Sequence, residues 1–267
     1  SSICAKKRKI PIFHLEAGNR CYDENVPEEV NRKIIDHISD FNITYSKTAE
    51  QNLIREGINP NNIVSVGSPL TELANKYKKK FENKKILLKK KLKKNNYFVA
   101  SIHREENTLN KEYVLKIENF FNHISNKYNK KIIFSTHPRL NKLLKKYKAN
   151  FSKNIIFHKP FGYFDYIVLQ KNSICVFSDS GSLTEETNIF GFNSINMRIT
   201  NERQEGMVEA VSPMCYFNSK QADILLKIIR SNKTKSKLID DYTSSNFSDK
   251  VIKIILSYQD LIKEKYI

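Results

Sequence analysis

The chain has 267 residues, of which 40% are hydrophobic, and this is enough for one large domain or two medium ones with their own cores. Its formal net charge of +18 would suit a nucleic-acid-binding protein, but only nine of the 46 basic residues are arginines and no aromatic-rich motif separates the lysines. We therefore expect a solvated lysine-rich surface and no nucleic-acid partner. Since no run of about 18 apolar residues occurs, we expect no membrane-spanning helix and no membrane partner.

The four cysteines, Cys4, Cys21, Cys175 and Cys215, lie far apart and form no Cys-x-x-Cys pair. This spacing argues against both a zinc site and a disulfide framework. We expect no bound metal and a cytoplasmic location.

The first part of the chain alternates between short apolar runs and amphipathic stretches. Strands are predicted at 10–14, 41–45 and 62–66, and helices at 27–40 and 47–56. In the first of these helices, four apolar residues are expected to form the buried side: Val30, Ile34, Ile35 and Ile38.

A helical or charged stretch at 70–92 contains the predicted domain boundary, and a regular alternation follows it. The strands predicted in this second part are 97–102, 131–135, 154–158, 173–177 and 194–197. The predicted helices are 111–128, a Lys-rich helix ending at Lys148, 164–171, 183–190, 221–230 and 250–265. Strands separated by helices predict an α/β fold with a parallel sheet covered on both faces.

Two glutamates follow the first predicted strand. Glu16 comes just past its carboxyl end, where ligands bind in open α/β sheets, and we expect its side chain to be buried there. Glu28 falls in the first turn of a helix that Pro27 opens. Paired carboxylates in different surroundings can divide acid and base work. The alternative is structural, because the helix dipole favours acids in a first turn and a glutamate after a strand can simply cap a turn.

A second group of polar residues lies in the second part. The run Asp179-Ser-Gly-Ser182, between a strand and a helix, offers backbone N–H groups to a diphosphate, and Glu186 could accept hydrogen bonds from ribose hydroxyls. Alternatively, Ser180 or Ser182 is an N-cap, and Glu185 or Glu186 completes a capping box. The run matches neither Walker A nor Gly-x-Gly-x-x-Gly, so ATP and NAD receive little support.

His103-Arg104 and His137-Pro-Arg139 also follow predicted strands, and His and Arg suit phosphate charge. They could equally be polar loop residues. Arg203 and Glu205, after the last strand, could close a ligand cleft or be surface charges. Acids on the first half and phosphate binders on the second would fit a nucleotide-sugar held between two α/β halves.

These residues fall into motifs that resemble the non-hydrolysing UDP-N-acetylglucosamine 2-epimerases. In family order the motifs are His14-Leu-Glu-Ala-Gly-Asn-Arg20, Pro27-Glu-Glu-Val-Asn-Arg32, Gly67-Ser-Pro69, His103-Arg-Glu-Glu-Asn107, Thr136-His-Pro138, Asp179-Ser-Gly-Ser-Leu-Thr-Glu-Glu186 and Glu202-Arg-Gln-Glu-Gly206. The stretches Gly18-Asn-Arg-Cys-Tyr-Asp-Glu-Asn-Val-Pro27 and Lys159-Pro-Phe-Gly-Tyr163 resemble the branch that forms UDP-N-acetyl-L-fucosamine for surface polysaccharides.

The resemblance implies two Rossmann-like domains in the glycosyltransferase-B arrangement, the first one incomplete at its N-terminus. We place these domains at 1–69 and 70–246, with a helix at 247–267 that crosses back to the first. The resemblance also implies inversion of C2 of a UDP-N-acetyl-hexosamine through elimination and re-addition of UDP. It implies that the reaction needs no cofactor or metal and that the enzyme is a homodimer. The residues that the resemblance and the strand-end motifs mark as catalytic are Glu16, Glu28 and His103. Those marked as binding UDP-sugar are Arg20, Arg104, His137, Tyr166, Ser180, Gly181, Ser182, Glu186 and Arg203.

The chain departs from the family pattern in three places. Family members begin well before Ser1 and carry there a catalytic Asp and an Arg and a Lys that bind substrate, so we expect these 267 residues alone to be inactive. Gln204 replaces the usual Pro, and Ser182 replaces a common Gly. Other interpretations are a glycosyltransferase of the same fold, a hydrolysing 2-epimerase and, more distantly, a basic nucleic-acid-binding protein.

Overall fold

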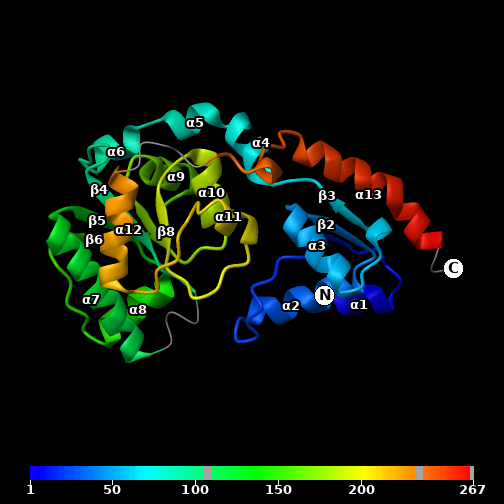
Figure 1. Ribbon diagram of the computed structural model, residues 1–267, viewed down its shortest axis with the longest axis horizontal. Coiled ribbons are helices and arrows are strands. Elements are labelled where there is room, and N and C mark those ends of the chain that lie inside the picture. Colours follow the sequence, from blue (N-terminus) through cyan, green and yellow to red (C-terminus); the bar gives the residue numbers. More distant parts are fainter. Residues whose placement is uncertain (105–109, 232–236, 265–267) are drawn as a thin grey trace. The chain divides into compact units, whose positions relative to one another are not determined.

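The computed structural model describes residues 1–104, 110–231 and 237–264. The chain forms two compact units. The first comprises Ser1–Lys76, Thr200–Glu205 and Leu238–Ile267, and the second comprises Tyr77–Ile199 and Gly206–Lys237 (Figure 1). The domain limits at 69, 246 and 267 remain a prediction.

The first unit is built on three parallel strands in the order β1-β2-β3: β1 (Phe13–Leu15), β2 (Phe41–Thr44) and β3 (Ile63–Ser65). Its helices are α1 (Ser2–Lys7), α2 (Pro27–Ile38), α3 (Lys47–Arg55), α4 (Pro69–Lys76) and α13 (Phe247–Glu264), with short 3-10 helices at Pro60–Asn62 and Asp240–Tyr242. Phe41 and Ile43 of β2 form one core with Phe247 and Val251 of α13, so the last helix packs on this sheet.

Local chemistry explains where these helices begin. Pro27 stands at the first position of α2, where its missing N–H costs no helical hydrogen bond. The Ser46 hydroxyl accepts the N–H of Ala49 at 3.2 Å and thereby caps α3. This cap helps to fix α3, which packs beside the turn that follows β1.

The expected buried face of α2 is only partly right. Val30 and Ile34 are 42% and 43% exposed and Ile35 and Ile38 are half-buried, whereas Glu29 and Asp36 are buried. The cause lies in the turn after β1, whose backbone N–H groups need acceptors. The carboxylates of α2 supply them, and so the polar side of this helix faces inward.

The second unit has five parallel strands in the order β6-β5-β4-β7-β8. The strands are β4 (Tyr97–Ser101), β5 (Lys131–Ser135), β6 (Ile155–His158), β7 (Val176–Ser178) and β8 (Ser194–Asn196). The helices are α5 (Lys78–Glu82), α6 (Lys85–Lys89), α7 (Lys111–Tyr128), α8 (Pro138–Lys146), α9 (Tyr163–Lys171), α10 (Leu183–Phe190), α12 (Ser219–Ser231) and α11 (Gln204–Val208), in which the chain returns to this unit. Phe98, Phe121 and Phe177 lie in its buried core.

The predicted alternation of strands and helices is confirmed, with ends that differ by a few residues. The stretch predicted as helical or charged at 70–92 contains most of α4 and all of α5 and α6. Helices α1 and α11 were not predicted. Among the described residues, no helix is both long and apolar enough to cross a membrane.

Gly18 allows α3 to approach the turn after β1. Its φ is +79°, and a Cβ built there would lie 2.2 Å from the Ala49 carbonyl oxygen. Gly57 provides a matched control, because its φ is +85° but a Cβ there would meet nothing within 4 Å. Gly57→Ala should lower the free energy of unfolding by about 1–2 kcal/mol through backbone strain alone, and Gly18→Ala should lower it further. Urea denaturation of both variants measures the difference; equal losses would contradict the close approach.

Candidate active site

Glu16 occupies a strained turn directly after β1. Its φ is +65°, in the left-handed region that residues other than glycine rarely adopt. Such strain costs on the order of 1–3 kcal/mol and persists where the surrounding structure enforces it, often at functional sites. The side chain is 46% exposed, so the expectation that it is buried is wrong. The turn instead presents the carboxylate at the surface of the first unit.

Arg203 contacts this carboxylate directly. Its Nη2 donates to Glu16 Oε1 at 2.6 Å, and Asn19 Nδ2 donates to the same oxygen at 3.3 Å. The guanidinium lies 5.8 Å from the centre of the Tyr45 ring, and the Arg203 side chain is only 4% exposed. The sequence had suggested Arg203 as a nucleotide-sugar contact of the second half. The structure places it in the first unit, beside Glu16.

The adjacent acids Glu28 and Glu29 have different surroundings. Glu28 is exposed in the first turn of α2. Glu29 is fully buried and accepts the backbone N–H groups of Cys21 at 3.0 Å and Tyr22 at 3.1 Å. Glu29 therefore fixes the loop before α2, a role that the sequence analysis missed, while Glu28 faces solvent.

Arg20, predicted as a UDP-sugar contact, binds two carboxylates of its own unit, and its role toward a ligand stays a prediction. It is 0% exposed, and its Nε and Nη2 each donate to Glu56 at 2.7 Å. Its Nη1 lies 2.7 Å from Asp36 Oδ2. Burial alone would lower the pKa of Arg20, but the bonds to Glu56 and Asp36 outweigh it and raise this pKa above its usual value. The guanidinium is a buried cation that links Asp36 to Glu56.

In the second unit, the loops after β5, β4 and β7 open on one edge, because these parallel strands are neighbours. His137, His103 and Asp179 follow them in that order. Asp179 is fully buried and accepts the backbone N–H groups of His103 at 3.0 Å and Arg104 at 3.0 Å. It therefore joins two strand ends, and nothing in the sequence analysis indicated this contact. Residues 105–107 of the His103 motif lie outside the described residues.

Asp179 also contacts the His103 ring. The ring Nδ1 lies 3.0 Å from Asp179 Oδ1, and the His103 side chain is 40% exposed. The hydrogen bond to Asp179 outweighs burial and raises the pKa of His103 above its usual value. An imidazolium that is both held and accessible can bind a phosphate.

His137 contributes in a different way. Its Nδ1 accepts the N–H of Arg139 at 3.3 Å and caps α8. This contact of the His137 ring serves the helix and does not involve a ligand. Arg104 Nε donates to the Asp179 carbonyl at 3.1 Å, which holds Arg104 at the same sheet edge.

The run from Ser180 to Ser182 leads into α10. Ser182 is the N-cap, but its side chain makes no capping bond; its hydroxyl instead donates to Glu186 Oε1 at 3.0 Å. Ser182 therefore does not form the capping box that was the alternative interpretation. Gln170 Nε2 donates to the other Glu186 oxygen at 3.4 Å. Burial raises the pKa of Glu186 to about 7, against the opposing effect of these two bonds.

Beside Glu186, α9 contributes further buried polar groups. Among the residues that the structure describes, the Gln170 carbonyl oxygen is buried without a hydrogen-bond partner, and the Tyr166 hydroxyl is buried near the side chains of Ser101 and Gln170. Burial also raises the pKa of Tyr166, which keeps the phenol neutral. Buried polar atoms without partners are uncommon and often mark a site that a ligand completes. The sequence indicated Tyr166 but not Gln170.

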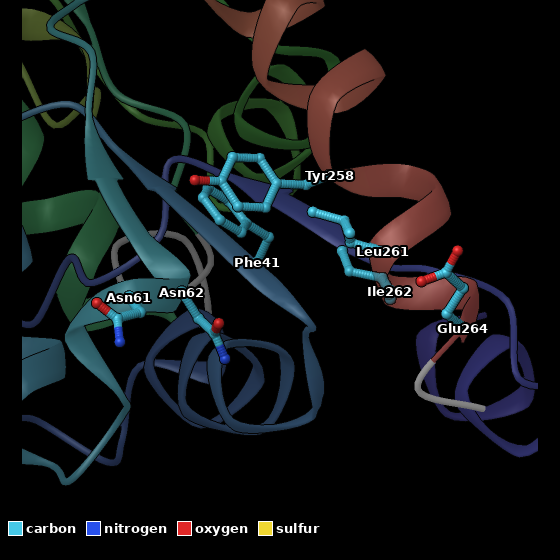
Figure 2. Close-up of a pocket in the computed structure, with 7 residues that line it drawn as sticks. All are labelled: Phe41, Asn61, Asn62, Tyr258, Leu261, Ile262 and Glu264. Carbon is cyan, nitrogen blue, oxygen red and sulfur yellow. The ribbon is translucent and has the colours of Figure 1, made fainter. Parts of the chain in front are cut away.

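A cavity of about 620 Å³ in the first unit is a different feature (Figure 2). Phe41 and Tyr258 face each other in it with ring centres 4.6 Å apart, and Leu261 and Ile262 extend its apolar side. The remaining lining residues are Asn61, Asn62 and Glu264. It lies at the amino ends of β2 and β3, and its described lining residues include no cation, so they do not suit a diphosphate.

Comparison with known proteins identifies the family. A family model described as UDP-N-acetylglucosamine 2-epimerase matches residues 1–256. The UDP-N-acetylglucosamine 2-epimerase of Methanocaldococcus jannaschii is 33% identical over 261 residues, which cover 95% of this chain and 71% of that protein. The chain belongs to the UDP-N-acetylglucosamine 2-epimerase family. This membership confirms the expected enzyme class, an epimerase.

Solved structures of the UDP-N-acetylglucosamine 2-epimerase family share this fold. The enzyme from Rickettsia bellii matches with a TM-score of 0.88 and 39% identity, over 98% of this chain and 71% of that one. The M. jannaschii enzyme, solved in complex with UDP-GlcNAc and UDP, matches with a TM-score of 0.84 and 31% identity, over 95% of this chain and 72% of that one. The predicted α/β fold with Rossmann-like units is confirmed.

Proposed function

We propose that this family member inverts C2 of a UDP-N-acetyl-hexosamine by eliminating UDP and adding it back. The observation that carries the proposal is the pair of polar centres in a chain that matches the epimerase family over residues 1–256. One centre is Glu16, held against Arg203, and the other is the Asp179 loop with His103 and Glu186.

In this proposal the second unit binds the nucleotide. The His103 ring and the guanidinium of Arg104 bind diphosphate oxygens. Backbone N–H groups of the run 180–182, at the start of α10, add hydrogen bonds to phosphate oxygens. Glu186 accepts the ribose hydroxyls, and Tyr166 and Gln170 add buried polar atoms beside it.

The carboxylates of the first unit act on the sugar. A base removes the C2 proton as the bond from C1 to the diphosphate oxygen breaks, which gives a glycal and UDP. Return of a proton to the opposite face of C2, with re-formation of the C1–oxygen bond, gives the epimer. We assign these proton transfers to Glu16 and Glu28 and leave their division open. The cycle has no net oxidation and moves only protons and UDP, so it requires no redox cofactor.

The finer assignments rest on the sequence motifs. We propose a substrate pair of UDP-GlcNAc and UDP-ManNAc, or a 6-deoxy-L sugar such as UDP-L-FucNAc, that supplies surface polysaccharides such as capsule or O-antigen. We also propose that the enzyme acts in the cytoplasm as a homodimer.

Product analysis tests the function. The native enzyme is incubated with UDP-GlcNAc, and separately with its 6-deoxy-L counterpart, and the products are identified by proton and phosphorus NMR. The proposal requires a C2 epimer that is still attached to UDP. Free sugar with released UDP would indicate a hydrolysing epimerase, and turnover only with an acceptor sugar would indicate a glycosyltransferase; either result would overturn the proposal.

A further inference from the structure

Asp36 of α2 is a fully buried carboxylate that the proposed reaction does not use. Three donors converge on it. His14 Nδ1 lies 2.6 Å from Oδ1, and the backbone N–H of Gly18 donates to Oδ2 at 3.2 Å. Arg20 Nη1 lies 2.7 Å from the same Oδ2. A buried charge with this many partners is costly to disturb and restricts whatever it holds.

These partners lie on both sides of Glu16. His14 is two residues before it and Gly18 is two residues after it. The Asp36 carboxylate therefore binds the chain on both sides of the strained turn. Gly18 is held a second time, because Asn52 Nδ2 of α3 donates to its carbonyl at 3.0 Å. The turn is therefore tied to both α2 and α3.

A second carboxylate reinforces this arrangement. Glu56, just after α3, accepts two bonds from Arg20, and the His37 Nε2 of α2 lies 3.0 Å from it. Asp36, Arg20 and Glu56 thus form a continuous chain of ion pairs from α2 to the end of α3. Glu16, whose φ is +65°, lies between the two residues that Asp36 holds, His14 and Gly18.

We propose that Asp36 is a positioning residue that fixes the direction of the Glu16 carboxylate through His14 and Gly18. This inference rests on the catalytic role proposed for Glu16. Asp36 does not touch substrate, so its loss should affect the chemical step rather than nucleotide binding.

The test is Asp36→Asn in the native enzyme. Asparagine keeps the size but presents an amide N–H₂ to donors that need an acceptor. We expect kcat to fall about tenfold, with KM for the UDP-sugar within about twofold of wild type and UDP affinity unchanged. Asp223→Asn is the matched control, because Asp223 also binds three donors, His123, Lys127 and Tyr128, but in the second unit. It should lower the melting temperature and leave kcat unchanged.

His14 supplies a second pair of variants, which decides the matter if Asp36→Asn does not fold. The amide N–H of His14→Asn can replace the Nδ1–H that points at Asp36, whereas His14→Leu has no donor. We expect kcat of His14→Asn to exceed that of His14→Leu at least fivefold. Equal kcat values in this pair, or an Asp36→Asn enzyme that melts earlier but turns over at the wild-type rate, would overturn the inference. If Glu16→Gln also retains kcat, the role proposed for Glu16 fails instead.

Discussion

Replacement of Glu16 by glutamine is expected to lower kcat of the native enzyme at least roughly 100-fold. Glutamine keeps the size of the side chain and can still accept the hydrogen bond from Arg203, but it cannot take the C2 proton. UDP affinity should change little, because the proposed nucleotide contacts lie in the second unit. Steady-state kinetics and calorimetric titration of UDP measure the two quantities.

The matched control is Glu24→Gln, in the loop before α2. The Glu24 side chain is 79% exposed and, among the described residues, pairs only with Lys33. Its kcat should equal that of wild type. A Glu16→Gln enzyme with wild-type kcat would show that Glu16 is not the essential base. The role would then pass to Glu28 or to an acid outside these residues.

Replacement of Glu186 by alanine is expected to weaken UDP binding about 10–100-fold, equivalent to about 1–3 kcal/mol. The reason is that ribose hydroxyls would lose a buried acceptor. Glu112→Ala is the control, because this α7 carboxylate is 71% exposed and contacts Lys116. Calorimetric titration at pH 8 measures both affinities. An unchanged affinity in Glu186→Ala, together with a lower melting temperature, would make Glu186 a structural residue only.

The same carboxyl predicts a pH dependence. Its pKa is raised from 4.5 to about 7. Between these two pH values the folded protein therefore keeps a proton on Glu186 that the unfolded chain has released. This group's contribution to stability therefore falls as pH rises from about 4.5 to about 7, and Glu186→Gln should remove that fall. For UDP, only the ionised carboxylate accepts from both ribose hydroxyls. The ratio of wild-type to Glu186→Gln affinity should rise with pH through about 7, because the ratio cancels the pH effects of groups that both proteins share.

The strand and helix pattern was accessible from the sequence because it depends on local spacing. Apolar runs identified β4 and β5, and Glu16 was correctly placed after β1 for the same reason. The contact of Glu16 with Arg203 was not accessible, because 187 residues separate the two and only the return of the chain to the first unit brings them together.

The sequence also did not predict which side chains of α2 point inward. Val30 and Ile34 have the spacing of a core face, yet they are exposed, because Asp36 and Glu29 turn inward to meet backbone N–H groups of the preceding turn. The surroundings of Arg20 were also hidden from the sequence. The family motif that ends at Arg20 predicts a substrate contact, but its donors meet buried Asp36 and the partly exposed Glu56, whose positions no local pattern reveals.

The central claim, reversible elimination across C1 and C2 of a UDP-sugar, is tested most directly in D₂O. The native enzyme is incubated with UDP-GlcNAc or its 6-deoxy-L counterpart, and the C2 proton signal is followed by NMR. The account predicts loss of this signal in both substrate and product as solvent deuterium enters C2, with the sugar attached to UDP at equilibrium. Epimer formed with its original C2 proton retained would contradict it.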